Sequence, residues 1–288
     1  MLVHIKELFA KPVRGKFAYP AFNTINLETT LGIISAAEEM NTPIIMETSE
    51  GAIKYAGLET IFEMMASLAI KAKVPIALHM DHGKDMEQLK RGIELGYSSV
   101  MIDHSGLDID QNIRDTKEIV AFAHKEGAWV QGEVGRIRGS EDWVSVSDSQ
   151  SSLTVPEEAK RFWEETGVDS LASAVGTIHG IIKMNGTAEA HVDIERIRAI
   201  ADQVPVPLVL HGASGVPDDI IKEAISAGIC IINIDTELRL AFTSKLRETL
   251  AEKLDEVDPR KYLTPSILAV KEAAKQKLTV FKTINQIN

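Results

Sequence analysis

The feature that most constrains the fold of this chain is a repeated alternation of short apolar runs with longer amphipathic stretches. The runs are rich in β-branched residues and mostly apolar throughout, which is typical of parallel strands buried on both faces. They occupy residues 17–22, 43–48, 75–81, 98–103, 128–134, 169–175, 207–212 and 228–234. Helical patterns lie between them, for example at 27–40, 58–72, 86–95, 113–126 and 218–227. Strand–helix repeats of this number, over roughly 250 residues, predict an α/β fold, the TIM (β/α)₈ barrel.

The domain organisation follows from the same repeat. A doubly wound open sheet is the alternative fold, but it usually has fewer strands. The chain has 288 residues, of which 44% are hydrophobic, enough for a sizeable core. Because no linker, internal repeat or low-complexity tract divides residues 1–288, we expect a single barrel domain with a C-terminal helical extension. The extension begins after about residue 258 and could support contacts between copies of the chain.

Two segments interrupt the strand–helix rhythm. Residues 135–155, rich in Gly, Ser and acidic residues, follow the fifth predicted strand. We expect a long loop there, either a lid over the active face or a disordered excursion. Residues 179–193 form a second predicted long loop, after the sixth strand.

Charge and composition exclude several classes of partner. The net charge of −11 disfavours nucleic acid, since a phosphate backbone needs a basic face. A small phosphorylated substrate remains compatible, because backbone N–H groups and one Lys can hold a phosphate. The sequence has neither an apolar run of about 18 residues nor a signal-peptide pattern, so we expect no membrane association. Cys230 is the one cysteine, and the reducing cytoplasm fits a chain without a disulfide.

Three of the eight histidines are followed directly by glycine, and each lies at or just past a predicted strand end: His82, His179 and His211. In a TIM barrel the carboxyl ends of the strands converge on one face, where catalytic residues lie. Three imidazoles with an open fourth position form the pattern of a catalytic zinc site. A single histidine is more often a satisfied polar residue, but the shared placement of these three favours metal binding.

Other residues near the strand ends extend this site. Asp81 directly precedes His82 and could exchange a proton with a substrate hydroxyl. His79, inside the third strand, is expected to pack or hydrogen-bond behind the ligands. The remaining histidines without such a setting read as surface or helix residues: His4, His124 and His191.

Several acidic residues have two open interpretations. Asp103 and Glu133 end the fourth and fifth strands and are either ligands of a second metal position or solvated loop acids. Glu141 and Asp142, in the long loop, are either functional acids or a solvated tip.

A phosphate site is predicted beside the candidate metal ligands. The segments HGASG (211–215) and NIDT (233–236) follow the seventh and eighth strands, where TIM barrels commonly hold phosphate. Backbone N–H groups at 212–214 and the hydroxyls of Ser214 and Thr236 are suitable donors.

These residues belong to a series of motifs that resembles the class II ketose-bisphosphate aldolases, the fructose- and tagatose-bisphosphate enzymes. The resemblance runs in order, with compatible spacing, from about residue 3 to 285. The motifs are AFNTINLE (21–28), ETSEGAIKYAG (47–57), HMDHG (79–83), QGEVGRIRGSED (131–142), VGTIHG (175–180), LVLHGASGVP (208–217) and NIDTELRLAF (233–242).

The resemblance implies a lyase that reversibly cleaves a ketose 1,6-bisphosphate to dihydroxyacetone phosphate and glyceraldehyde 3-phosphate, through an enediolate that zinc stabilises. His82, His179 and His211 would bind the zinc. Asp81 would exchange the proton of the O4 hydroxyl. Glu141 matches a mobile-loop acid implicated in proton transfer at C3.

The family also implies a substrate site and further ions. Asp103 and Glu133 match positions that bind a second or displaced metal ion in some relatives, and a monovalent cation near the phosphate occurs in others. Homodimers and homotetramers are the family's assemblies. The residues that would contact the substrate are Asn23, Ser49, Gly180, Gly212, Ala213, Ser214, Asn233, Ile234, Asp235 and Thr236.

Some positions depart from the commonest family pattern, namely His104, Ser173, Ile178 and Ala213. They leave the metal and phosphate residues in place but bear on the aldehyde half of the substrate. The sequence does not separate fructose from tagatose bisphosphate, or zinc from cobalt, manganese or iron. The alternatives are an aldolase for a modified phospho-sugar such as 6-phospho-5-dehydro-2-deoxy-gluconate, another metal-dependent TIM-barrel sugar-phosphate enzyme, or a non-catalytic binder.

Overall fold

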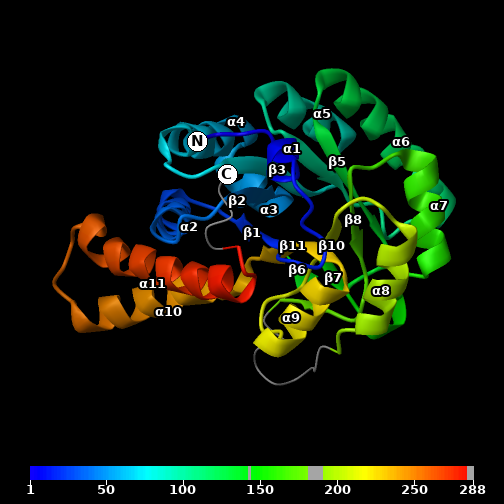
Figure 1. The fold of residues 1–288 in the computed structure, drawn as a ribbon. Helices are drawn as coiled ribbons and strands as arrows, with labels where there is room; N and C mark the ends of the chain where they lie inside the picture. Colours follow the sequence, from blue (N-terminus) through cyan, green and yellow to red (C-terminus); the bar gives the residue numbers. More distant parts are fainter. Residues whose placement is uncertain (142–143, 181–190, 284–288) are drawn as a thin grey trace.

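The computed structural model of the protein describes residues 1–141, 144–180 and 191–283. Eight parallel strands close into a barrel in the order β1-β11-β10-β8-β5-β4-β3-β2 (Figure 1). The predicted α/β TIM barrel is therefore confirmed, and the open sheet is excluded. The barrel strands are β1 (Tyr19–Asn23), β2 (Ile44–Ser49), β3 (Ile76–Gly83), β4 (Ser99–Ile102), β5 (Trp129–Val134), β8 (Ser170–Ser173), β10 (Leu208–Leu210) and β11 (Ile229–Ile234).

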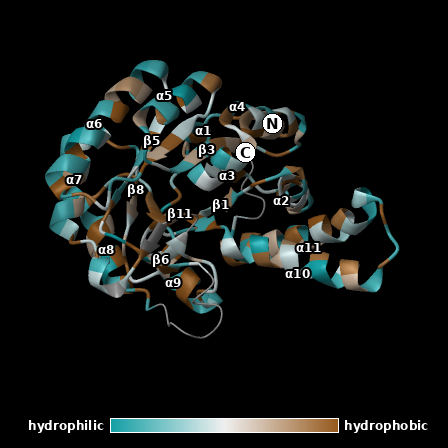
Figure 2. Cartoon of the chain, turned by 180° about the vertical axis from the view of Figure 1, so that it is seen from behind, coloured by the Kyte–Doolittle hydropathy of each residue, from teal (hydrophilic) through white to brown (hydrophobic). Residues whose placement is uncertain are grey.

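Helices surround this barrel. Their outward faces are hydrophilic, as Figure 2 shows for α5, α6 and α7. None of the helices in the described ranges combines the length and apolar character needed to cross a membrane. The helices around the barrel are α1 (Ile5–Leu8), α2 (Leu27–Glu39), α3 (Glu50–Ala56), α4 (Leu58–Lys71), α5 (Met86–Leu95), α6 (Ile109–Glu126), α7 (Pro156–Thr166), α8 (Ile194–Gln203) and α9 (Asp218–Ala227).

The core has two layers because successive strand residues face opposite sides. One layer lies between the strands and the helices, and the other fills the barrel interior. Ile44 packs in the outer layer, whereas its neighbour Ile45 packs in the inner one. Ile5 and Leu8 of α1 belong to the inner cluster. Apolar side chains thus fill the barrel on the side of α1. The polar residues lie at the opposite end, where the strands end.

A second, smaller sheet lies above the barrel, where the sequence predicted an irregular loop over 135–155. In this sheet β6 pairs antiparallel with β7 and parallel with β9. The pairing sets Gly139 beside His179, so the hairpin holds a candidate metal ligand in place. Of the second predicted loop, residues 181–190 lie outside the described residues. The elements concerned are β6 (Arg138–Glu141), β7 (Val144–Val146), the 3₁₀ helix η1 (Asp148–Gln150) and β9 (Ile178–His179).

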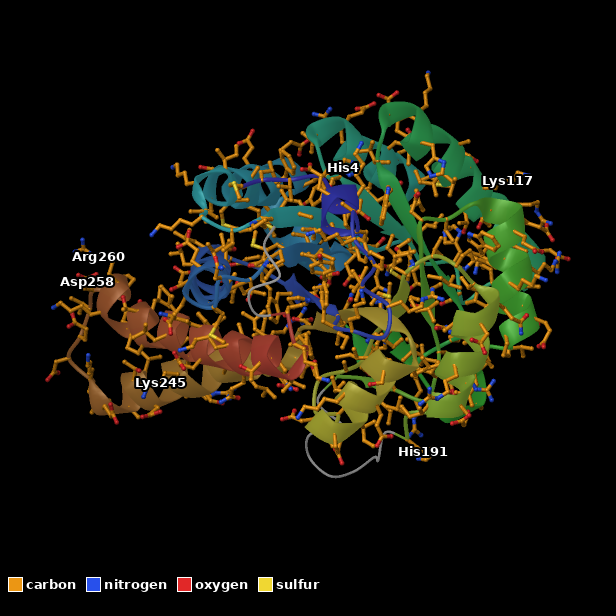
Figure 3. All side chains as sticks on the ribbon, in the orientation of Figure 1. His4, Lys117, His191, Lys245, Asp258 and Arg260 are labelled. Carbon is orange, nitrogen blue, oxygen red and sulfur yellow. The ribbon has the colours of Figure 1, made fainter. Side chains whose placement is uncertain are left out.

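Two long helices, α10 (Thr236–Glu252) and α11 (Pro259–Val280), form an arm that extends from the barrel (Figure 1). At its base α11 packs on α2, where Glu39 pairs with Lys271 and Lys275 at 2.5 and 2.6 Å. Arg260, at the far end of the arm, lies well away from the barrel (Figure 3).

Candidate active site

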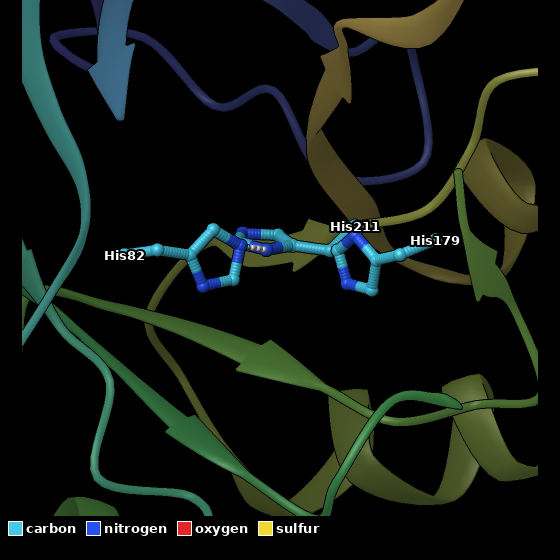
Figure 4. A group of neighbouring side chains, drawn as sticks. All are labelled: His82, His179 and His211. Carbon is cyan, nitrogen blue, oxygen red and sulfur yellow. Dashed lines mark hydrogen bonds between the residues drawn. The ribbon is translucent and has the colours of Figure 1, made fainter. Parts of the chain in front are cut away.

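The three predicted metal ligands meet at the carboxyl ends of the barrel strands. Figure 4 shows the rings of His82, His179 and His211 converging from separate segments of the chain. The Nδ1 atom of His211 lies 2.9 Å from Nε2 of His82. One nitrogen from each ring lies within 4.8 Å of the others. Nitrogens around a tetrahedral zinc ion are about 3.4 Å apart, so the three rings fit such an ion after small shifts.

The backbone at His82 explains how two adjacent side chains reach the same mouth. His82 has a φ of 50°, in the left-handed region that non-glycine residues rarely adopt. The pairing of β3 with β4 shifts register between Met80 and Gly83. As a result the Nε2 atom of His82 lies 4.0 Å from a carboxylate oxygen of Asp81.

Asp103 orients the ring of His82. Its Oδ2 accepts a hydrogen bond from the Nδ1 of His82 at 2.9 Å. Its Oδ1 accepts one from the hydroxyl of Ser105 at 2.7 Å. Burial alone would raise the pKa of the Asp103 carboxyl, but the hydrogen bonds from His82 and Ser105 outweigh burial and hold that pKa below its usual value. An ionised Asp103 keeps the His82 proton on Nδ1 and leaves Nε2 for a ligand.

Glu133 is a buried acid whose surroundings suit a cation. Its side chain is 3% exposed, and Oε2 has no hydrogen-bond partner in the described part of the chain. That oxygen lies 3.7 Å from the Nδ1 of His211. Burial, followed by the charge of Asp103, raises the pKa of Glu133 to about 8. His82, Asp103 and Glu133 together form a second group of possible ligand atoms within 4.8 Å of one another.

Asp81 is fixed by two amide donors. Its side chain is 1% exposed. The Nδ2 of Asn23 donates to Oδ2 at 2.9 Å, and the Nδ2 of Asn233 donates to Oδ1 at 3.4 Å. The two donors hold the Asp81 carboxyl in one orientation, in which a substrate hydroxyl could give it a proton.

The predicted phosphate residues lie on neighbouring loops. Gly212 has a φ of 61°, and Ser214 is buried. Asp235 precedes α10 and pairs with Arg239 at 2.6 Å. The side chain of Ile234 is 1% exposed, so only its backbone can meet a ligand. Ala213, Asn233 and Thr236 adjoin these residues along the chain, whereas Gly180 follows His179 at the end of β9.

A cavity of about 400 Å³ opens onto the ligand group. His82, Asp103, Glu133 and His179 line it, together with the predicted substrate residue Ser49. Sequence reasoning gave no role to several further lining residues, although Arg136 lies within the motif of residues 131–142: Lys84, Ser105 and Arg136.

Three further residues singled out from the sequence are His79, His104 and Glu141. His79 is buried and hydrogen-bonds Ser99 through Nδ1 at 2.8 Å, which is one of the two roles predicted for it. Both ring nitrogens of His104 face oxygens, Asp115 Oδ2 at 2.8 Å and the Lys84 carbonyl at 3.2 Å. His104 therefore links two segments in the wall of the cavity and is not part of the three-histidine group. Glu141 ends β6, but its side chain, like Asp142, lies outside the described part.

A family model described as fructose-bisphosphate aldolase class-II matches residues 3–286. The chain belongs to the class II fructose-bisphosphate aldolase family. The fructose-bisphosphate aldolase of Thermus caldophilus is 44% identical to it, over 99% of this chain and 100% of that relative. The enzyme of the same name from Helicobacter pylori is 36% identical, with 100% of both chains covered. The crystal structure of the YdjI aldolase from Escherichia coli K12 matches with a TM-score of 0.86 at 35% identity, covering 100% of both chains.

Membership of the class II aldolase family makes this chain an aldolase, a lyase of carbohydrate metabolism. Enzymes of class II depend on a divalent metal. The structure fits such an ion on its own evidence, because three imidazole nitrogens converge beside a buried carboxylate oxygen without a hydrogen-bond partner among the described residues.

Proposed function

We propose that this class II aldolase reversibly cleaves a ketose 1,6-bisphosphate, fructose or tagatose, to dihydroxyacetone phosphate and glyceraldehyde 3-phosphate. The observation that carries the proposal is the convergence of three histidines beside the fixed carboxylate of Asp81. The two curated relatives are both named fructose-bisphosphate aldolase, which favours the fructose substrate.

We assign the catalytic metal, zinc, to His82, His179 and His211. When bound there, zinc supplies the Lewis acid that stabilises the negative charge left on the substrate after carbon–carbon cleavage. Asp103 and Glu133, with His82, offer the second metal position. Because the metal carries the charge, the reaction needs no Schiff-base lysine.

In the proposed cleavage, Asp81 accepts the proton of the O4 hydroxyl. The C3–C4 bond then breaks, the aldehyde leaves, and the electron pair remains on the C3 side. Glu141 returns a proton to C3, or removes it in the synthetic direction. The Asn23 and Asn233 amides hold Asp81 in position for its part.

The phosphate of dihydroxyacetone phosphate would bind Gly180 and the stretches Gly212–Ala213–Ser214 and 233–236. The start of α10 supports this assignment, because the N–H groups and dipole of a helix N-terminus favour an anion. A monovalent cation beside this phosphate is part of the proposal.

A second candidate is an aldolase for a modified phospho-sugar such as 6-phospho-5-dehydro-2-deoxy-gluconate. The observation that favours it is His104, which departs from the family pattern and lines the cavity. The side chains of Lys84 and Arg136 line the same cavity and could meet an acidic group at the far end of the sugar.

The domain organisation, assembly and location of the enzyme are also inferred from the sequence. We expect a single barrel domain with its helical arm, assembled as a homodimer or homotetramer. Its partner is a small phosphorylated sugar, and neither nucleic acid nor a membrane is involved. We assign it to the cytoplasm, where the buried thiol of Cys230 stays reduced.

The test is a cleavage assay on zinc-loaded protein with fructose 1,6-bisphosphate, tagatose 1,6-bisphosphate and the modified sugar supplied separately. A coupled dehydrogenase detects dihydroxyacetone phosphate. Release from either bisphosphate supports the proposal, and the preferred sugar names the substrate. Release from the modified sugar alone selects the second candidate, and release from none contradicts both.

A further inference from the structure

Gln131 stands at one end of a line of hydrogen-bonding groups that runs through the site. It lies in β5 with a 2% exposed side chain, and its Nε2 is 2.9 Å from the Nε2 of His211. The other nitrogen of that ring, Nδ1, is 2.9 Å from the Nε2 of His82. The Nδ1 of His82 is in turn 2.9 Å from Asp103. The line thus joins two candidate metal ligands to two flanking residues.

The direction of each bond follows from proton counting. A neutral imidazole has one N–H donor and one acceptor nitrogen. An ionised carboxylate only accepts, so His82 holds its proton on Nδ1 and presents Nε2 to the site. In the arrangement that the structure shows, the amide N–H of Gln131 donates to Nε2 of His211, and His211 donates from Nδ1 to His82.

Metal binding requires the opposite tautomer of His211. An ion between the His82 and His211 rings needs the lone pair of His211 Nδ1, so the proton of that ring must move to Nε2. A metal-bound imidazole almost always donates its other N–H to an acceptor. The side-chain amide of Gln131 lies within hydrogen-bonding distance of this Nε2. Turning its amide by 180° exchanges the nitrogen and oxygen at nearly the same positions, which gives Nε2–H an acceptor.

We propose that Gln131 is a positioning residue for the metal site. Its side-chain oxygen accepts the Nε2 proton of His211 and thereby keeps Nδ1 available for the ion. The inference rests on the proposed function, because it takes His82, His179 and His211 as the metal ligands. Asp103 performs the same task for His82.

A neutral side chain at position 131 is favoured by the buried acid nearby on the same strand. Glu133 follows two residues later on the same strand, so its buried carboxyl faces the same side of the sheet as Gln131. A second carboxylate there would add negative charge to a buried interior, at a desolvation cost. An amide accepts the proton without that charge.

The main test measures the zinc affinity of purified protein by competition with a chromophoric chelator. Gln131→Met keeps the length of the side chain but removes the acceptor, and should weaken zinc binding about 10- to 100-fold. Gln131→Glu restores an acceptor and should bind within about threefold of the unchanged protein, or more tightly. Met101→Leu is the matched control, since Met101 Sδ is the other contact of the amide, at 3.1 Å. Its affinity should not change.

The outcomes separate this inference from the proposed function. Equal affinity in Gln131→Met and the unchanged protein overturns the role of Gln131 and leaves the metal site intact. No zinc binding by the unchanged protein, or undiminished binding by His211→Ala, overturns the metal site and with it the inference.

A second measurement needs no variant, in case Gln131→Met does not fold. Nitrogen NMR of the zinc-loaded protein, labelled with ¹⁵N-histidine, reports which ring nitrogen of His211 carries the proton. We expect the proton on Nε2 and the metal on Nδ1. A proton on Nδ1 of His211 would refute the proposal.

Discussion

The backbone of His82 lets two neighbouring residues share the mouth of the barrel. In an extended strand Asp81 and His82 would face opposite sides of the sheet. The φ of 50° at His82 turns the chain so that both side chains meet. A candidate metal ligand and a candidate base therefore lie next to each other without a loop between them.

Asp81→Ala should lower turnover by about 10²- to 10⁴-fold, the usual contribution of a positioned acid–base group. Zinc content should stay at one ion per chain, because Asp81 is absent from the three-histidine group. Steady-state kinetics and metal analysis together make the check, with the exposed Asp110→Ala as control. Unchanged turnover in Asp81→Ala would show that Asp81 does not accept the O4 proton.

Folding stability should depend on pH because the imidazole of His79 is buried. Burial, followed by the nearby charge of His82, lowers the pKa of His79 from 6.5 to about 3. Below pH 6.5 the unfolded chain therefore binds a proton that the folded chain does not. The stability from this group is complete above pH 6.5 and is lost as the pH falls toward 3. The free energy of unfolding should drop by about 1.4 kcal/mol per pH unit in that window.

Urea unfolding at pH 7 and pH 5, in EDTA, measures this dependence. His79→Gln should remove the contribution, whereas His124→Gln, at an exposed ion pair with Asp169, should keep it. The same pH slope in His79→Gln and the unchanged protein would show that His79 is not the source.

At the scale of elements, the small β6-β7-β9 sheet determines the position of His179. Gly139 has a φ of 111°, and a Cβ there would clash with the backbone of His179. The strand pairing therefore depends on a glycine at this point. The sheet is the structural reason that His179, a candidate metal ligand outside the barrel strands, lies close to His82 and His211.

Gly139→Ala should displace His179 and lower turnover about 10²-fold, the effect of misplacing a catalytic group by about 1 Å. Gly127→Ala is the matched control. Gly127 has a φ of 82°, but among the described residues no atom lies within 4 Å of an added Cβ. It should lose about 1 kcal/mol of stability and keep its turnover. Equal turnover in the two variants would argue against the role of the sheet.

The hydrophobic pattern was enough to predict the barrel strands, because each run is buried on both faces. It placed the start of α6 four residues late, at 113 and not 109, since the cap of that helix is a polar contact between Asp108 and the backbone N–H of Gln111. The β6–β7 hairpin was missed because its strands are only four and three residues long. Their pairing with β9 depends on residues far along the chain.

Within the site, spacing and resemblance led to the three histidines and Asp81. They gave no role to Ser105 or to Gln131, although Gln131 begins the motif QGEVGRIRGSED (131–142). The partner of each side chain cannot be read from the sequence. Ser105 donates to Asp103, and Gln131 meets His211, the residue after β10. Such partners become visible only when the fold brings the strand ends together.

At the scale of the whole molecule, the α10–α11 arm offers apolar surface that the barrel does not cover. Leu254 and Val257, near the turn of the arm, are 84% and 87% exposed. Exposed apolar residues gathered in one place are typical of a contact between chains. The base of the arm also contacts the loop of residues 211–215, because Glu237 pairs with Lys277 and accepts the N–H of Gly215 at 2.6 Å.

The combined change Leu254→Glu and Val257→Glu should shift the protein toward a smaller species in analytical ultracentrifugation, since buried charges weaken an apolar contact. Ile70→Glu, at an exposed residue of α4, is the control and should leave the assembly unchanged. A smaller species with Ile70→Glu alone would indicate that the interface lies on the barrel and not on the arm. An unchanged assembly in the double variant would remove the arm from it.

The most direct test of the central claim is a zinc titration of chelator-treated protein, following release of dihydroxyacetone phosphate from fructose 1,6-bisphosphate. We expect no release without metal, a rise that saturates at one ion per chain, and no rise for His211→Ala. Cleavage that persists at full rate after the metal is removed, or that returns equally in His211→Ala, would contradict a three-histidine metal site as the source of the aldolase activity.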